Sequence, residues 1–314
     1  MVNIAMIGTG KEAQQHFSQW SQIEDVVVTE VLATASAQDT WPETLDAKKI
    51  ENASEMEAEI VDICVPTAEK ATWIQQVAKQ GVHIICETPL AATAKEASAI
   101  VAVCKEKGAQ LYTRTSKQYA PAYHNARENV ANGKIGKPGV ARLSHTKAHP
   151  GNTGENIFTS LGAPVFAWLT ETFGDAERVM AKHVKEVRQD GSPVEYGLVS
   201  IRMTDQSFAH VELSWASEEE KDRFELTGDQ GMLTHDSEAS NPVAVSLSSG
   251  KHTQSEAVLT KTALHRKLEA IVSQIKAGTD LESTANSTVQ PEQMAEAALQ
   301  SAQTGQPVLL KEVR

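Results

Sequence analysis

The sequence lacks any apolar run close to the roughly 20 residues that a membrane-spanning helix needs. No basic segment precedes the apolar N-terminus, so no signal peptide is predicted. Basic residues are also few, with 29 Lys and Arg against 41 Asp and Glu, which gives a net charge of -12. This charge argues against a nucleic-acid partner, because phosphates would be repelled without a basic patch. We therefore expect neither a membrane nor a nucleic-acid partner.

Cysteine is scarce as well. The three residues, Cys64, Cys86 and Cys104, are far apart in apolar or helical segments and show no metal-ligand spacing. We expect reduced, partly buried thiols, which are typical of a cytoplasmic protein, and we predict no metal site.

Short apolar runs alternate with helical stretches over residues 1–120. Because continuous apolar strands separated by helices are typical of a parallel sheet covered on both faces, this region is predicted to be a doubly wound, Rossmann-type nucleotide-binding domain. The strands are expected at 3–7, 26–35, 60–65, 82–86 and 110–114, and the helical stretches at 11–22, 54–58, 68–80 and 92–107.

The pattern changes after Pro121, where alternating apolar and polar residues predominate. Residues 121–314 are therefore predicted to be an α+β domain with a large, mostly antiparallel open sheet that has one packed face and one wetter face. A loose loop is expected at 280–290. Helices are expected at 124–132, 263–277 and 291–304, and strands at 140–149, 176–189, 194–203, 207–216, 222–227, 231–235, 243–248 and 308–310.

A glycine-rich loop follows the first predicted strand and opens the first helix. It reads Gly8-Thr9-Gly10-Lys11-Glu12-Ala13. The first glycine would form the turn, the second would let the backbone approach a pyrophosphate, and the small third residue would let helix and strand pack. Free N–H groups and the helix dipole favour phosphate at this point. The loop predicts dinucleotide binding through residues 8–12.

The acid that usually holds the ribose 2′-hydroxyl is missing. The second strand ends at Ala33-Thr34-Ala35-Ser36, where Asp or Glu would normally stand. Ser36 could bind a 2′-phosphate, although no arginine follows to pair with it. The cofactor is therefore predicted to be NAD or NADP, with a lean towards NADP.

Taken with the glycine loop, an ordered set of further motifs resembles the Gfo/Idh/MocA oxidoreductases, which include glucose–fructose oxidoreductase and inositol dehydrogenase. The similarity spans nearly the whole chain, and it implies a nicotinamide cofactor and an open sheet face that pairs with another subunit. The motifs are 87–90 (Glu-Thr-Pro-Leu), 132–138 (Asn-Gly-Lys-Ile-Gly-Lys-Pro), 168–169 (Trp-Leu), 173–175 (Phe-Gly-Asp), 227–233 (Thr-Gly-Asp-Gln-Gly-Met-Leu) and 304–308 (Thr-Gly-Gln-Pro-Val).

The same resemblance shows that the family's acid–base residues are missing here. The catalytic lysine of the family's Glu-Lys-Pro motif is replaced by Thr88, and the paired Asp and His positions hold Ser160 and Pro164. A further Asp position holds Ala167, and the family's Pro-Asn-x-x-His motif reads Pro-Thr-Ala-Glu-Lys over residues 66–70. The family pattern still implies that Pro66, Thr67, Glu87 and Thr88 contact the cofactor.

Two other residues are candidates for the proton transfer. Lys117 falls at the first arginine of the family's Arg-Arg-Phe-x-Pro stretch, and burial could bring a lysine into a catalytic range. His149 shares one strand face with His145 and Lys147 and ends the strand. The alternatives are an exposed charge that orients substrate for Lys117, and a solvated sheet face for the histidines. His16 and His83 are expected to pack locally.

The sequence thus predicts a two-domain protein that moves hydride between NAD(P) and a sugar, polyol or related hydroxy compound. Since the family's Lys, Asp and His are absent, a non-catalytic relative that binds a dinucleotide or a sugar is the alternative. A scaffold that uses only its sheet for association would bind no cofactor. A small-molecule substrate and a homodimer or homotetramer are expected.

Overall fold

The computed structural model describes residues 1–34, 41, 45–151, 156–239, 243–249, 252–257, 261–278 and 285–313. The chain divides into two compact units, Met1–Tyr119 with Lys261–Val289, and Ala120–Thr260 with Gln290–Arg314. The sequence placed a single boundary at residue 120. The return of 261–289 to the first unit was not visible in the residue pattern.

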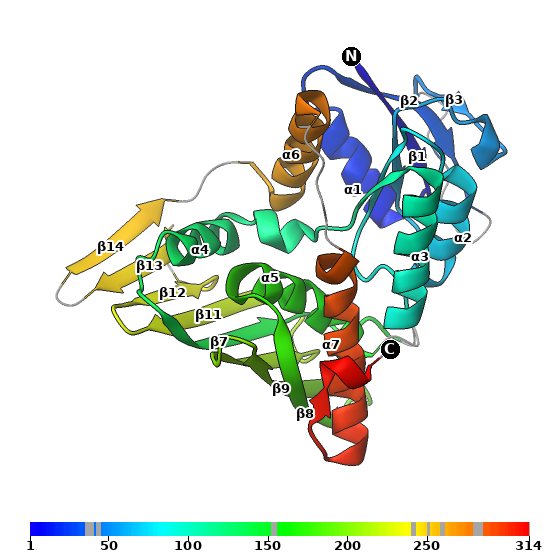
Figure 1. Ribbon diagram of the computed structural model, residues 1–314. Helices are drawn as coiled ribbons and strands as arrows, with labels where there is room; N and C mark the ends of the chain where they lie inside the picture. The colour runs from blue at the N-terminus through cyan, green and yellow to red at the C-terminus, as the bar shows by residue number, and fades with distance from the viewer. Residues whose placement is uncertain are drawn as a thin grey trace. The chain divides into compact units, whose positions relative to one another are not determined.

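The first unit is a parallel six-stranded sheet with the order β3-β2-β1-β4-β5-β6, the strand order of a dinucleotide-binding domain (Figure 1). The predicted doubly wound fold is confirmed. The strands are β1 (Val2–Ile7), β2 (Val26–Leu32), β3 (Lys48–Lys49), β4 (Ile60–Ile63), β5 (His83–Cys86) and β6 (Gln110–Tyr112), and the helices α1 (Lys11–Trp20), α2 (Thr67–Val77), α3 (Ala94–Lys107) and α6 (Ala263–Ala277).

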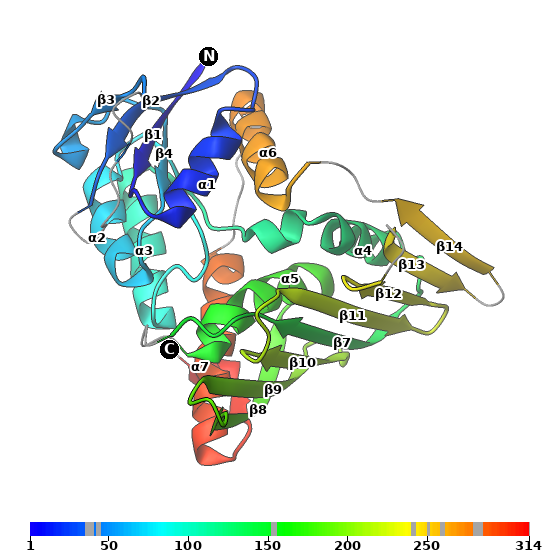
Figure 2. The same cartoon turned by 180° about the vertical axis from the view of Figure 1, so that it is seen from behind.

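Helices cover both faces of this sheet. On one face, Ile74 of α2 and Ile100 of α3 pack on strand residues such as Ile63. On the other, Trp20 of α1 and Leu268 of α6 join a second apolar cluster. In Figures 1 and 2, α1 and α6 lie on one side of the sheet, and α2 and α3 lie on the other. Parallel strands buried on both faces explain why these segments read as continuous apolar runs.

Helix α6 is well specified at both ends although it is remote in sequence. The side chain of Thr262 accepts a hydrogen bond from the backbone N–H of His265, and Gly278 closes the helix in the left-handed region at φ 61°. These are favoured N-terminal and C-terminal caps. The local sequence therefore determines the helix, and its apolar face determines that it packs on the first unit.

The second unit is built on a nine-stranded sheet, in which β7 and β10 pair in parallel and the other neighbours are antiparallel (Figure 2). Its order is β14-β13-β12-β11-β7-β10-β9-β8-β15. The strands are β7 (Pro138–Thr146), β8 (Ala176–Val187), β9 (Pro193–Met203), β10 (Phe208–Ser214), β11 (Lys221–Gly228), β12 (Met232–Asp236), β13 (Val243–Ser249), β14 (His252–Ala257) and β15 (Val308–Leu309), and the helices α4 (Pro121–Ala131), α5 (Ala163–Phe173) and α7 (Ala285–Thr304).

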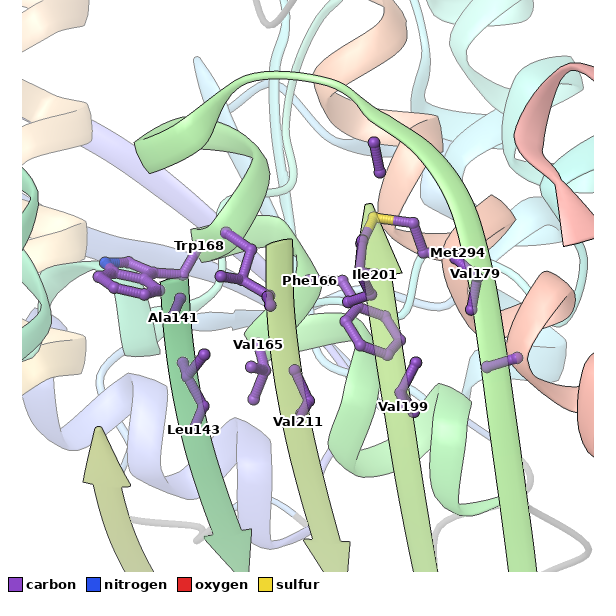
Figure 3. Packing of buried hydrophobic residues seen from close by; sticks show 14 of the residues in the cluster. Ala141, Leu143, Val165, Phe166, Trp168, Val179, Val199, Ile201, Val211 and Met294 are labelled. Carbon is purple, nitrogen blue, oxygen red and sulfur yellow. The ribbon is translucent and has the colours of Figure 1, made fainter. Parts of the chain in front are cut away.

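One face of this sheet carries the core of the second unit. Figure 3 shows Leu143 of β7, Val211 of β10 and Val199 of β9 on the face that carries Val165 and Phe166 of α5, and all belong to one buried cluster with Met294 of α7. The period-two burial along the strands produces this arrangement, since alternate side chains point to opposite faces.

The opposite sheet face presents large apolar side chains to solvent. Met180 and Val184 of β8, Tyr196 and Leu198 of β9 and Phe208 of β10 are each 42–48% exposed. Scattered exposed apolar residues are normal, but a group on adjacent strands is typical of an interaction surface.

Most predicted elements are confirmed, including the hairpin at Asp205-Gln206 between β9 and β10. Three expectations were wrong. Residues 54–58 form only a 3₁₀ turn at Ala53–Glu55, and two strands, β3 and β14, were not predicted. Of the loop expected at 280–290, residues 285–290 are helical, so that Pro291 lies inside α7, and residues 280–284 lie outside the described residues. Within the described residues, the helices include none with the length and apolarity to span a membrane.

Candidate functional site

The two glycines of the loop after β1 serve different purposes. Gly8 has φ +111°, and a Cβ there would lie 2.0 Å from the carbonyl oxygen of Cys64, so the fold itself requires glycine. Gly10 has the ordinary φ of −67°, and a Cβ there would meet nothing within 4 Å. The fold therefore has room for a side chain at position 10, and only a ligand that approaches the backbone would require glycine there.

Helix α1 begins directly after Gly10, and no side chain caps its N-terminus. Its first N–H groups are available to an anion, as the pyrophosphate site requires. Two buried oxygens here, Thr9 Oγ1 and Glu12 Oε1, have no hydrogen-bond partner. Buried polar atoms are nearly always paired, so these orphans favour a bound ligand.

Glu87, which follows β5, sits in a network drawn from across the first unit. Its Oε1 accepts hydrogen bonds from Lys267 Nζ at 2.7 Å and Ser116 Oγ at 2.7 Å. Burial raises the pKa of Glu87, but Lys267, His16 and Ser116 together outweigh burial, so the net pKa lies below the ordinary value. Lys267 is itself fully buried, which alone would lower its pKa, but the Glu87 carboxylate and the other charges near it raise the net pKa and hold it as an ammonium.

A second buried lysine holds the backbone of the same loop. Lys70 Nζ donates to the carbonyl oxygens of Glu87 at 2.6 Å and Pro89 at 2.7 Å. Lys70 stands at the last position of the Pro-Thr-Ala-Glu-Lys segment. The two carbonyls flank Thr88, whose buried Oγ1 has no hydrogen-bond partner. A positive charge is thus present beside position 88, although it comes from α2 and not from residue 88.

His16 belongs to the charged cluster around Glu87, which also includes Asp62 and Lys267, contrary to the expectation that it only packs locally. Its Nδ1 lies 2.8 Å from Asp62 Oδ2, which also accepts from Trp20 Nε1 at 2.7 Å. Burial alone would lower the pKa of His16, but the Asp62 carboxylate raises it above its ordinary value. For Asp62, burial raises the pKa, but His16, Trp20 and Lys267 together outweigh burial, so the net pKa is lowered.

The residues at the family's Asp and His positions lie in the second unit. Ser160 is in a π-helical turn, Phe158–Gly162, and Pro164 is in the first turn of α5, where proline is tolerated. His149 follows β7 and is 15% exposed. Its Nδ1 accepts from the N–H of Gly151, and its Nε2 lies 3.6 Å from Glu195 Oε1.

One interpretation of the sequence expected His145 on a solvated sheet face, but the residue is buried. It is 5% exposed, and its Nδ1 lies 2.8 Å from Asp222 Oδ1, which also accepts from the Tyr123 hydroxyl. The period-two pattern assigned His145 and His149 to one face, but β7 ends at Thr146 and each histidine pairs with a different carboxylate. Lys147, also beyond the strand, is exposed.

Two trios of the described residues bring metal-type donor atoms within 4.8 Å of one another: Glu12, His16 and Cys64, and His145, Glu220 and Asp222. We assign neither to a metal. In the first, burial raises the pKa of the Cys64 thiol well above its ordinary value and disfavours the thiolate that binds metal. In the second, Asp222 already accepts from His145 and Tyr123.

The remaining predicted residues lie in the first unit or outside the described chain. Lys117 is half-buried in the 3₁₀ turn Ser116–Tyr119 of the first unit, and Lys11 is exposed at the start of α1. Pro66 and Thr67 open α2 at the carboxyl end of β4. Ser36 lies outside the described residues. All three cysteines are free and buried, as expected.

Sequence reasoning missed Lys267 and Lys70. Lys267 lies 180 residues from Glu87, so no local pattern connects the two. The sequence did hold a signal for Lys70. Of the residues that replace the family's acid–base residues, it is the only one with a charged side chain.

Comparison with known proteins identifies the family. Residues 2–115 match the oxidoreductase family with an NAD-binding Rossmann fold, and residues 123–234 match the Gfo/Idh/MocA C-terminal domain. The chain belongs to the Gfo/Idh/MocA family. Both matches agree with the division into a parallel sheet and a second, mixed sheet.

Family relatives cover most of the chain at low identity. An uncharacterised oxidoreductase of Bacillus subtilis, YrbE, is 22% identical over 98% of this chain and 96% of its own length. A D-apiose dehydrogenase of Paraburkholderia graminis is 24% identical over 73% of this chain and 66% of its own. The crystal structure of an Agrobacterium radiobacter oxidoreductase in complex with NAD+, L-tartaric acid and magnesium has a TM-score of 0.83, with 15% identity, 100% coverage of this chain and 99% of that one.

The His16–Asp62 pair predicts how stability depends on pH. Because the pKa of His16 is raised, its contribution is complete below its unfolded value of about 6.5 and is lost as the pH rises through the folded value. Asp62 has a lowered pKa, so its contribution exists above about pH 4 and is lost on acidification. Urea unfolding from pH 3 to 9 should therefore show a decline on both sides.

The variant His16→Gln should lose about 2 kcal/mol near pH 5.5, because the hydrogen bond to a charged partner is lost, and most of the alkaline decline should disappear. His83→Gln, outside the charged cluster, is the control and should keep the parent profile. An alkaline limb that is identical in the parent and His16→Gln would contradict the assignment of this charge.

Proposed function

We propose that this protein is an NAD(P)-dependent oxidoreductase that acts on a sugar, a polyol or a related hydroxy compound. One observation carries the cofactor assignment, namely that the packing of the fold does not require a glycine at position 10. Gly10 stands where an uncapped helix N-terminus and two orphaned oxygens converge. The family's oxidoreductases, and the D-apiose dehydrogenase among the relatives, support the reaction class.

The residues present fit a dinucleotide. Residues 8–12 would hold the pyrophosphate, and Pro66, Thr67, Glu87 and Thr88 would lie along the carboxyl ends of β4 and β5. A bound nicotinamide would accept or supply the hydride. The lean towards NADP rests only on the missing acid at the end of β2.

The proton of the substrate hydroxyl needs an acceptor of its own. Thr88, Ser160 and Pro164 provide none, so we propose Lys117 or His149 for this step, which general bases accelerate by about 10²–10⁴-fold. Lys117 follows Ser116, whose hydroxyl donates a hydrogen bond to Glu87. Lys117 is therefore adjacent in sequence to a residue that contacts the loop after β5. His149 has the Glu195 carboxylate beside its Nε2, at 3.6 Å from Oε1.

The cofactor assignment is tested by a matched pair of glycine variants. Gly10→Asp should fold with nearly the parent melting temperature, since nothing lies within 4 Å, yet it should weaken NADH and NADPH binding at least about tenfold through bulk and charge. Gly8→Ala should instead destabilise the fold, because its Cβ would overlap the Cys64 carbonyl. The measurements are reduced-cofactor fluorescence titration and thermal unfolding. Gly10→Asp that binds both cofactors like the parent would refute the site.

Turnover is expected to be slow on ordinary sugar-dehydrogenase substrates, even when cofactor binds well. Where D-apiose, D-xylose or myo-inositol is oxidised, Lys117→Met or His149→Ala should lower kcat by about 10²-fold or more without weakening cofactor affinity. Thr88→Lys alone should not restore fast turnover. Brisk activity that survives both substitutions would contradict the proposed roles. Tight cofactor binding with no turnover on any such compound would favour the non-catalytic alternative.

We also propose that the exposed face of β8, β9 and β10 pairs with a second copy of the chain, as the family resemblance implies. The apolar side chains on these strands support an isologous contact. Light scattering at micromolar concentration should give a dimer or tetramer, and Leu198→Glu should shift it towards monomer, because a charge would be buried at the centre of this face. Lys95→Glu, an exposed change on α3 of the other unit, should not. A monomeric parent would overturn the proposal.

A further inference from the structure

Glu12 lies in the first turn of α1, within the proposed cofactor site, and the glycine motif does not explain why a carboxylate stands there. It is the second residue of α1, one residue after the helix begins, so its carboxyl group lies within one turn of the expected pyrophosphate. The dinucleotide fingerprint asks for no acid at this position. A fixed negative charge beside phosphates would oppose binding unless it faces a different part of the cofactor.

The surroundings of Glu12 show which half of the site it faces. A carboxyl oxygen of Glu12 lies within 4.8 Å of a ring nitrogen of His16 and of the thiol of Cys64, which follows β4. The charged groups that act on the carboxyl are Lys70 of α2, His16 of α1, Glu87 after β5 and Asp62 of β4. None of them comes from β2, which lies on the opposite side of β1 from β4 and β5. Dinucleotide-binding domains hold the adenosine ribose at the end of the second strand, so the nicotinamide half lies over β4 and β5. Glu12 is therefore on the nicotinamide side.

The Glu12 side chain also has an unused hydrogen-bonding oxygen that a ligand could contact. Oε1 is buried without a hydrogen-bond donor, although the residue as a whole is only half-buried. Burial raises the pKa of the Glu12 carboxyl above its ordinary value, and the nearby Lys70 ammonium offsets only part of that rise. A carboxyl group with these properties changes charge closer to neutral pH than a surface glutamate does.

From this geometry we propose that Glu12 faces the nicotinamide ring and that its ionisation sets the preference between oxidised and reduced cofactor. The oxidised ring carries a positive charge and the reduced ring does not. An ionised Glu12 therefore stabilises NAD(P)+ selectively, whereas a protonated Glu12 treats both forms alike. The proposal rests on the proposed function, because it requires the cofactor to occupy this site.

The experiment measures binding of NAD+ and NADH, and of NADP+ and NADPH, by calorimetry from pH 4.5 to 8.5, and requires no substrate. In the parent, the ratio of the NAD+ to the NADH dissociation constant should fall by about three- to tenfold as the pH rises, since ionised Glu12 attracts the oxidised ring. In Glu12→Gln, which keeps the shape of the side chain, the ratio should be nearly independent of pH.

Two further variants make the result specific. Glu12→Asp keeps the charge and should keep a pH-dependent ratio. Glu96→Gln removes an exposed carboxylate from the equivalent first turn of α3 and should behave like the parent. If Glu12→Gln retains the parent's pH dependence, another titrating group such as His16 is responsible, and the inference is overturned. If the parent binds none of the four nucleotides, the proposed function itself fails.

Discussion

The buried ion pair between Glu87 and Lys267 is the interaction on which the candidate site depends. It joins the loop after β5 to a helix 180 residues away, with a separation of 2.7 Å and a fully buried ammonium. Removing one partner of such a pair leaves an uncompensated buried charge, which costs about 3–5 kcal/mol. The pair therefore specifies where α6 packs, and it fixes the carboxylate around which Ser116 and His16 are arranged.

A second lysine completes the same design from the backbone side. By bonding to the carbonyls of Glu87 and Pro89, Lys70 holds the segment that contains Thr88 without any contribution from residue 88 itself. Lys70 thus supplies a positive charge near the position of the family's lysine, but it does not supply that lysine's acid–base function. A buried ammonium that donates to two carbonyls is a structural group. This division explains how the loop keeps its form while the acid–base residues are lost.

Much of the fold could be predicted because it is encoded locally. The apolar runs of β1, β4 and β5 and the capped helices α3 and α6 are each specified by a few adjacent residues, such as Thr93 and Gly108 around α3. Errors arose where packing overrides propensity. The Ser-, Thr- and Asn-rich stretch before Pro291 is helical because Thr288, Val289 and Gln290 are buried. His145 is buried because Asp222, on the neighbouring strand β11, pairs with it.

The sequence by itself determined the alternation of strands and helices in the first unit, the glycine loop and the loss of the family's lysine, since each depends on residue type at a position or on short periodicity. Only the tertiary structure decided that Gly8 is required by the fold while Gly10 is not, because that difference depends on a carbonyl from β4's end that lies beside one glycine and not the other. It alone also brought Lys70, Lys267, His16 and Glu12 around one loop. Charges compensate one another through space, and in this protein the compensating groups lie far apart along the chain.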